Sequence, residues 1–343
     1  MKTVAAFGNP LLDTIANIPD FNLLHKYNLE KDGQKEVDQK TMQSLSKDIE
    51  VYEKSISAGG CSQNTLRVLQ WLSSKRLKTY IYGSVGDDTD AITLKQLLEN
   101  DEVYTRYSVQ RNLSTGTSIS LVTQSNRSLV ANVEAAENYS LNDLLASDYE
   151  EVILRCSYVY IEGFFLTKRK DVVKHVVNYC NKNRKLLIFN LSGQYLVEQE
   201  TELVTFCIER ADVIFGNKRE YVAYCKLHNL PDIKSLAHHL IKHTEYKHGA
   251  NKIVIVTNGA EDVYCYDNSD IEYKFIVPPV HESEIVDTTG AGDAFVAGFI
   301  AGLLAGKTLN QCSEIGCYAA HNIIKLPGCT LPDFKPNLGV LLE

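Results

Sequence analysis

The stretch Asp287-Thr288-Thr289-Gly290-Ala291-Gly292-Asp293-Ala294-Phe295 constrains the fold of this chain more than any other. A β-like segment, Tyr273 to Pro278, precedes it, and a run of small and apolar residues, Ala294 to Gly306, follows it. This order predicts a loop that leads into the N-terminus of a buried helix. The first N–H groups of a helix have no partner within it, and the helix dipole makes this end partly positive. Because glycine lets a ligand approach the backbone closely, we expect a site for an anion such as phosphate.

Asp293 stands where it would repel a phosphate unless its carboxylate has a chemical task. Taking the proton from an attacking hydroxyl is such a task. Alternatively, Asp293 caps the helix, and Gly290 and Gly292 merely turn the chain. Short glycine-rich motifs often mislead, so the stretch alone leaves both interpretations open.

The composition is that of an ordinary globular protein. Of the 343 residues, 44% are hydrophobic and 23% are charged, and the length suggests one large α/β domain with a smaller insertion. The net charge of −8 argues against a surface that coats nucleic acid. The longest apolar run, Ala294 to Gly306, is shorter than the roughly 20 residues that a membrane helix needs. We therefore expect neither nucleic acid nor a membrane as a partner.

The cysteines indicate a reducing compartment. There are nine, an odd number, and no two of them form a Cys-x-x-Cys pair. A disulfide framework or a zinc knuckle is therefore not expected. The short apolar run in Met1 to Gly8 is too short for a signal peptide and is typical of a first strand. We expect a cytosolic protein.

From about residue 152 onward, predicted strands and helices alternate. Such a pattern is typical of an α/β fold with a mostly parallel central sheet and helices on both faces. Near residues 15–60 and 100–135, strands follow one another without a full βαβ unit, which predicts a small β-rich lid. Strands are expected at Val152–Glu162, Leu186–Asn190, Asp212–Phe215 and Lys252–Thr257, and a helix at Asp171–Asn183.

Two further motifs offer groups that bind hydroxyls. Gly8-Asn9-Pro10-Leu11-Leu12-Asp13 follows the predicted strand Thr3–Phe7, at the end where α/β sheets usually bind ligands. The Asp13 carboxylate can accept hydrogen bonds from two vicinal hydroxyls, although a turn aspartate also bonds its own backbone. Ala58-Gly59-Gly60-Cys61-Ser62-Gln63-Asn64 precedes a predicted helix. Here Asn64 either contacts a ligand or caps the helix.

Together these motifs resemble those of the ribokinase-like (PfkB) family of sugar and nucleoside kinases. The resemblance runs from Gly8 to about Pro332 and is strongest to the nucleoside kinases. It implies a ribokinase-like fold in which residues 1–14, 61–112 and 138–343 form the large domain. Residues 15–60 and 113–137 would form the lid. It also implies ATP as phosphate donor, adenosine as acceptor and Mg²⁺ as cofactor, and we expect a monomer.

The resemblance also implies roles for individual residues. Asp293 would be the catalytic base, the backbone from Gly290 to Gly292, including Ala291, would form the anion hole, and Arg127 would approach the phosphates. Asn9, Asp13 and Asn64 would bind the ribose. The other implied substrate contacts are Gln34, Gly59, Gly60, Leu129, Ala131, Phe165 and Tyr195, and the implied cofactor contacts are Asn190, Asn217, Thr257, Gly259 and His321.

Two of these assignments have an alternative in ordinary structure. Asn217-Lys218-Arg219-Glu220 places two side-chain oxygens on one side of a starting helix, which suits Mg²⁺ held through water. Without the family, helix capping explains this motif better. Similarly, the resemblance implies that one ring of Phe164-Phe165 stacks on a purine. The alternative is that both rings pack in the core.

Some positions depart from the family's pattern. They are Thr289, Lys35, Glu36, Glu137 and the segment Gly193-Gln194-Tyr195. Because several of them border the implied base pocket, inosine, guanosine or a sugar are alternative acceptors. A non-catalytic nucleoside sensor is a further alternative, but the presence of Asp293 and the anion-hole glycines argues against it.

Overall fold

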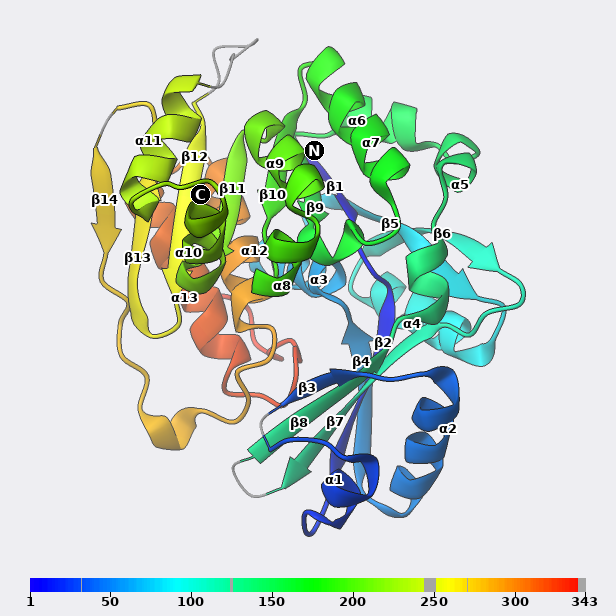
Figure 1. The fold of residues 1–343 in the computed structure, drawn as a ribbon. Helices are drawn as coiled ribbons and strands as arrows, with labels where there is room; N and C mark the ends of the chain where they lie inside the picture. The colour runs from blue at the N-terminus through cyan, green and yellow to red at the C-terminus, as the bar shows by residue number, and fades with distance from the viewer. Residues whose placement is uncertain (32, 124–125, 244–250, 270, 339–343) are drawn as a thin grey trace.

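Two β-sheets of different size organise the chain in a computed structural model (Figure 1). The structure describes residues 1–343 except residues 32, 124–125, 244–250, 270 and 339–343. The larger sheet has nine strands and the smaller has five. The prediction of an α/β fold with a mostly parallel central sheet and a separate small β-rich part is confirmed.

β1 (Thr3–Phe7) lies inside the nine-stranded sheet, and all of its residues are buried. Its apolar sequence suits a strand covered on both faces. The strand order is β14-β13-β12-β11-β10-β9-β1-β5-β6, in which neighbours from β12 to β6 are parallel and β13 and β14 are antiparallel. The other strands are β5 (Lys78–Gly86), β6 (Val103–Gln110), β9 (Tyr158–Glu162), β10 (Leu186–Asn190), β11 (Val213–Asn217), β12 (Ile253–Asn258), β13 (Glu261–Tyr266) and β14 (Glu272–Phe275).

Helices cover both faces of this sheet. Buried apolar side chains form one cluster between the helices and the sheet on each face. Successive residues of β1 point alternately into the two clusters. The helices on the Phe7 side are α5 (Leu141–Leu145), α6 (Tyr149–Arg155), α7 (Lys170–Lys182), α8 (Gln194–Gln199), α9 (Thr201–Arg210), α10 (Lys218–Leu227) and α11 (Ile233–His243). Those on the Ala6 side are α3 (Cys61–Leu72), α4 (Thr89–Asn100), α12 (Ala291–Leu304) and α13 (Leu309–Ile323).

The smaller sheet lies below the larger one in Figure 1, with its helices α1 (Asn22–Tyr27) and α2 (Gln39–Asp48) on one side. A third cluster of buried apolar side chains lies between these two helices and the face of the smaller sheet that they cover. The strand order is β3-β8-β7-β2-β4. The bounds are β2 (Leu11–Asn17), β3 (Gln34–Glu36), β4 (Lys54–Gly59), β7 (Gly116–Thr123) and β8 (Asn126–Asn132). Because β2 begins at Leu11, it crosses the boundary expected after residue 14, and the division into domains stays a prediction.

One predicted strand is partly wrong. The segment expected as a strand over Val152–Glu162 begins as the end of α6, and only β9, from Tyr158, is extended. One face of α6 is buried, at the helical spacing of Tyr149, Val152 and Ile153. The apolar strand that follows made this spacing difficult to recognise in the sequence. Among the helices that the structure describes, none has the length and apolar character needed to cross a membrane.

Candidate active site

The predicted sugar and cofactor motifs meet along one edge of the larger sheet. β12, β11, β10, β9 and β1 are neighbouring parallel strands, so their carboxyl ends lie side by side, where α/β sheets bind ligands. Asn190 is the last residue of β10, and Asn217 is the last of β11. Thr257 lies near the end of β12, and Asn9 follows β1. The fold therefore brings residues that are far apart in the sequence to one place.

α12 (Ala291–Leu304) begins directly after Gly290, so its first turn contains Gly292 and Asp293. Gly290 is its N-cap residue and has a left-handed φ of 74°. A Cβ on Gly290 would lie 2.8 Å from the Cβ of Cys329, so this position has no room for a side chain. By contrast, the described residues leave open space where Gly292 would carry its Cβ. The first turn of α12 therefore has open space at Gly292, and anion binding there stays a prediction.

Asp293 lies in this first turn, and its side chain points toward α3. Its Oδ2 accepts a hydrogen bond from Nδ2 of Asn64 at 3.0 Å, and the thiol of Cys61 donates a second one. Only 8% of Asp293 is exposed. The N-cap position belongs to Gly290, so the carboxylate is engaged across the site and does not act as the N-cap of its own helix.

Burial raises the pKa of Asp293 to about 6, and the hydrogen bonds from Asn64 and Cys61 oppose this rise. The carboxylate of Asp13 adds to it. The partly positive N-terminus of α12 favours the ionised form of Asp293. Burial counteracts the dipole, so the carboxylate is mainly ionised only above about pH 6 and can then accept a proton.

Asn9 and Asn64 each have a buried side-chain oxygen without a hydrogen-bond partner among the described residues. Their amide nitrogens are occupied, because that of Asn64 donates to Asp293 and that of Asn9 donates to the carbonyl of Phe164 at 3.2 Å. A buried acceptor without a donor is costly. A ligand with hydroxyl groups would supply the missing donors.

Asp13 lies on β2, where the hydroxyl of Ser118 donates to its Oδ1 at 2.6 Å. Burial raises the pKa of Asp13 to about 6. A Cβ on Gly59 would lie 2.0 Å from Cγ of Asp13, and one on Gly60, which has a φ of 82°, would lie 2.1 Å from the carbonyl oxygen of Asn9. The two glycines therefore allow the two predicted sugar motifs to touch.

Strand register places the predicted lid contacts on a single face of the smaller sheet. Residues paired across neighbouring strands point to the same side, and so do alternate residues along one strand. One face of the smaller sheet carries the residues that pack on α1 and α2. The face away from these helices carries Asp13, Gln34, Gly59, Arg127, Leu129 and Ala131.

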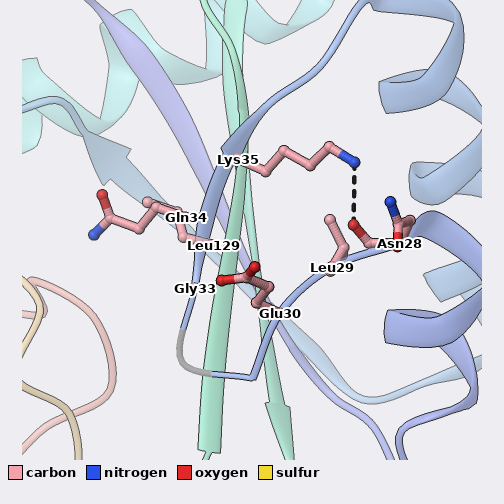
Figure 2. A pocket seen from close by; sticks show the side chains of 7 residues that line it. All are labelled: Asn28, Leu29, Glu30, Gly33, Gln34, Lys35 and Leu129. Atoms are coloured by element: carbon pink, nitrogen blue, oxygen red, sulfur yellow. Dashed lines mark hydrogen bonds between the residues drawn. The ribbon is translucent and has the colours of Figure 1, made fainter.

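Gln34 and Lys35 point to opposite sides of β3 (Figure 2). The Nζ of Lys35 donates to the carbonyl oxygen of Asn28 at 3.1 Å. A cavity of about 330 Å³ lies between β3 and the loop before it, lined by Asn28, Leu29, Glu30, Gly33, Gln34, Lys35 and Leu129. Of the two charged residues that follow Gln34, therefore, only Glu36 shares its face.

Arg127 reaches from the smaller sheet to the loop before α12. Its Nε lies 3.4 Å from Oδ2 of Asp287, and its Nη2 donates to the hydroxyl of Ser120 at 2.9 Å. Asp287 also accepts hydrogen bonds from the amides of Thr289 and Gly328, each at 2.9 Å. The guanidinium is thus next to the anion-hole loop, and in this structure it is paired with a carboxylate.

The structure favours Phe164 over Phe165 as the aromatic residue of the site. Phe165 is completely buried, and its ring packs against that of Phe7 with centroids 5.9 Å apart. This position gives it no access to a substrate, contrary to the prediction. Phe164 is partly exposed, and its ring lies 6.2 Å from that of Tyr195, itself half-exposed. The short 3₁₀ turn Gly163–Phe165 directs the neighbouring rings to different sides.

Asn217 and Glu220 form a capping box at the start of α10. Oε2 of Glu220 accepts from the amide of Asn217 at 2.8 Å, and Oδ1 of Asn217 accepts from the amide of Glu220 at 3.0 Å. Burial raises the pKa of Glu220 to about 7, so a nearby cation would stabilise its ionised form. In the described part of the chain, no group of three or more His, Cys, Asp and Glu side chains could bind a metal directly. Carboxylate and amide oxygens suit Mg²⁺ that keeps its waters, and a role of Asn217 and Glu220 in binding it stays a prediction.

The remaining predicted cofactor contacts lie at or near this edge. The hydroxyl of Thr257 donates to the carbonyl of Gly216 at 3.4 Å. Gly259 has a φ of 61° and open space around it, within the described residues. His321, on α13, bonds to the carbonyl of Pro278, and partial burial lowers its pKa. Their roles in ATP binding stay predictions.

Residues 30–335 match the family described as pfkB family carbohydrate kinase. The chain belongs to the pfkB family. The family predicted from Asp287–Phe295 and the strand-end motifs is therefore confirmed.

Known relatives of this pfkB-family chain include several adenosine kinases. It is 30% identical to "Adenosine kinase 1" of Arabidopsis thaliana, over 96% of both chains. It is also similar to the adenosine kinase of Schistosoma mansoni in complex with adenosine and AMP, with a TM-score of 0.84 and 29% identity over 96% of this chain and 97% of that one. The adenosine kinase of Anopheles gambiae in complex with a di(adenosine-5) tetraphosphate gives a TM-score of 0.85 and 30% identity, over 96% of this chain and 98% of that one.

Three residues that contact the predicted site residues were not among those predicted. They are Cys61, Ser118 and Glu162. Glu162 is buried at the end of β9, directly after Val159-Tyr160-Ile161. The sequence does contain a signal for Glu162, because a charged residue at the end of an apolar strand often lies where α/β sheets bind ligands.

Proposed function

We propose that this pfkB-family protein acts as an adenosine kinase, which transfers the γ-phosphate of ATP to the 5′-hydroxyl of adenosine and releases AMP and ADP. The observation that carries the proposal is the environment of Asp293. This buried carboxylate lies at the N-terminus of α12, next to Asn64, whose side-chain oxygen lacks a partner among the described residues. The surrounding chain is similar to adenosine kinases over 96% of its length.

The ribose would lie between the two sheets. The carboxylate of Asp13 and the side-chain oxygens of Asn9 and Asn64 are acceptors, and the 2′- and 3′-hydroxyls are the matching donors. A sugar without one of these hydroxyls would leave a buried acceptor unpaired. The site should therefore discriminate against deoxynucleosides.

In the proposed reaction, Asp293 takes the proton of the 5′-hydroxyl as its oxygen attacks the γ-phosphoryl group. The amides from Gly290 to Asp293 stabilise the charge of the transferred group, and Arg127 approaches it from the lid. Bound Mg²⁺ would neutralise charge on the phosphate oxygens. Asn217 and Glu220 would hold its waters. Rate enhancement then comes from positioning and electrostatics.

The base would contact the lid face and the pair of Phe164 and Tyr195. Partial burial raises the pKa of Glu36, and Glu137 raises it further. Burial also raises the pKa of Tyr195, with Glu36 as the next cause. Two carboxylates therefore lie near the base end of the site. Glu137 pairs with Lys168, but a carboxylate such as that of Glu36 can accept a hydrogen bond from a ring N–H group, which favours a second candidate function, a kinase that also phosphorylates guanosine or inosine.

A coupled ADP-release assay with adenosine, inosine, guanosine and ribose, with and without Mg²⁺, tests these proposals. We expect Mg²⁺-dependent turnover with the highest kcat/KM for adenosine. Strong turnover of adenosine without detectable turnover of inosine and guanosine would rule out the second candidate. A preference for ribose, or adenosine binding without any ADP release, would contradict the proposed function and indicate a sugar kinase or a sensor.

We further propose that the protein is a cytosolic monomer. All nine cysteines are free thiols in the structure, which fits a reducing compartment. Light scattering coupled to size-exclusion chromatography would test the oligomeric state. Fluorescence microscopy of a tagged protein would test the location.

A further inference from the structure

Glu162 joins two segments of the backbone. Its Oε1 accepts a hydrogen bond from the amide of Asn9 at 2.9 Å, and its Oε2 accepts one from the amide of Ser62 at 2.7 Å. The side chain is 1% exposed. Each carboxylate oxygen therefore binds a different part of the chain, out of contact with water.

Both segments are connections between the two sheets. Residues 8–10 lead from β1 of the larger sheet to β2 of the smaller one, and Gly60 leads from β4 back to α3. Glu162 itself ends β9, a neighbour of β1 inside the larger sheet. One side chain on a central strand thus fixes two of the connections between the large part of the molecule and the lid.

The surrounding residues accommodate this arrangement. A Cβ on Gly8 would lie 2.8 Å from Oε1 of Glu162, so glycine leaves the space that the carboxylate occupies. The N-cap residue of α3 is Gly60, which has no side chain to bind the first amides of the helix. Glu162 supplies this acceptor from β9, and a negative charge is favourable at a helix N-terminus. The hydroxyl of Ser62 also donates to the carbonyl of Phe7 at 3.0 Å.

Burial opposes the negative charge of Glu162, and the hydrogen bonds that the carboxylate accepts favour it. Burial raises the pKa of Glu162 to about 7, and the nearby carboxylate of Asp293 contributes to the rise. The amides of Asn9 and Ser62 and the guanidinium of Arg169 lower it. An apolar side chain of similar size would avoid the desolvation of a buried charge. Stability alone therefore gives little reason for a glutamate here, whereas positioning of the two amides does.

We propose that Glu162 is a positioning residue for phosphoryl transfer. By holding the amides of Asn9 and Ser62, it sets the positions of the sugar-binding groups that follow each of them, Asp13 and Asn64. Asn64 in turn binds Asp293, so the acceptor hydroxyl and the base are aligned by the same carboxylate. This inference rests on the proposed function for the identity of the substrate.

Steady-state kinetics of Glu162→Gln test the proposal. Glutamine keeps the shape of the side chain, but one of its two terminal atoms is a donor, so one backbone amide loses its acceptor. We expect the KM for adenosine to rise roughly tenfold or more, as loss of a charged hydrogen bond implies. The KM for ATP should stay within about twofold, and thermal melting should show that the variant is folded.

Asp148→Asn is the matched control. Asp148 accepts hydrogen bonds from the hydroxyl of Tyr82 at 3.0 Å and from Nε of Arg106 at 2.8 Å, at a place distinct from the sugar motifs. This variant also loses a carboxylate that accepts two hydrogen bonds, although one that is 36% exposed, and it should leave both KM values unchanged. The proposal is overturned if folded Glu162→Gln keeps the wild-type KM for adenosine, or if its two KM values rise equally.

Amide hydrogen exchange of the ligand-free protein tests the geometry without any substrate. Peptides that contain the amides of Asn9 and Ser62 should exchange faster in Glu162→Gln than in the wild type, and equally fast in Asp148→Asn and the wild type. Unchanged protection in Glu162→Gln would overturn the proposal. Failure of the proposed function would appear instead as a wild-type protein that does not phosphorylate adenosine, whatever the exchange shows.

Discussion

At the scale of single residues, the proposed chemistry depends on Asp293. Asparagine has almost the same shape and can still accept the hydrogen bond from Asn64, but it is a poor base. We expect Asp293→Asn to bind both substrates and to lose a factor of ~10²–10⁴ in kcat. Kinetics and thermal melting should be measured on one preparation. Turnover within a few-fold of the wild type would exclude Asp293 as the base.

The pKa of Asp293 makes activity and stability depend on pH. Because only the ionised carboxylate accepts a proton, kcat should fall as the pH is lowered through about 6. The pKa in the fold lies above the ordinary value of 3.8, so the folded chain binds this proton more tightly than the unfolded chain. The contribution of Asp293 to the free energy of unfolding therefore decreases as the pH rises from 3.8 to about 6. Asp293→Asn should remove this dependence in pH-dependent melts, and a flat kcat profile across pH 6 in the wild type would contradict the assignment.

At the scale of secondary-structure elements, the N-terminus of α10 combines capping with the proposed role in Mg²⁺ binding. Glutamine at position 220 keeps the capping box, because its carbonyl can still accept from the amide of Asn217, but it removes the charge. Glu220→Gln should raise the Mg²⁺ concentration for half-maximal activity by about tenfold, with little change in melting temperature. Glu220→Ala should in addition lose about 1 kcal/mol of stability. If the Mg²⁺ titration of Glu220→Gln matches that of the wild type, the pair serves only as a cap.

At the scale of the whole molecule, Arg127 and Asp287 link the smaller sheet to the anion-hole loop. The side chains of Arg127 and Asp287 are only 21% and 5% exposed, and the position of the guanidinium beside the anion-hole loop favours a role in phosphate binding. Arg127→Met should lower kcat/KM for ATP by roughly 10²-fold, as loss of one donor to a transition state does. Arg106→Met removes a comparable pair with Asp148 elsewhere and should leave kcat/KM unchanged. Equal kcat/KM values in Arg127→Met and the wild type would remove Arg127 from the proposed mechanism.

The sequence by itself determined the elements that depend on local pattern. Apolar runs such as Thr3–Phe7 predict buried parallel strands, since both faces of such a strand are covered. Gly290 and Gly292 before an apolar run predict a helix N-terminus, because the signals that start a helix lie in neighbouring residues. The family assignment follows from the same short motifs.

Only the tertiary structure decided what depends on contacts between distant segments. The bonds from Glu162 to Asn9 and Ser62 arise because β9 lies next to β1, and no local pattern records that neighbour. The orientation of Phe164 and Phe165 depends on which ring fits the core. The raised pKa of Asp293 likewise comes from burial against α3, because desolvation is a property of the packed site and not of the residues beside it in the chain.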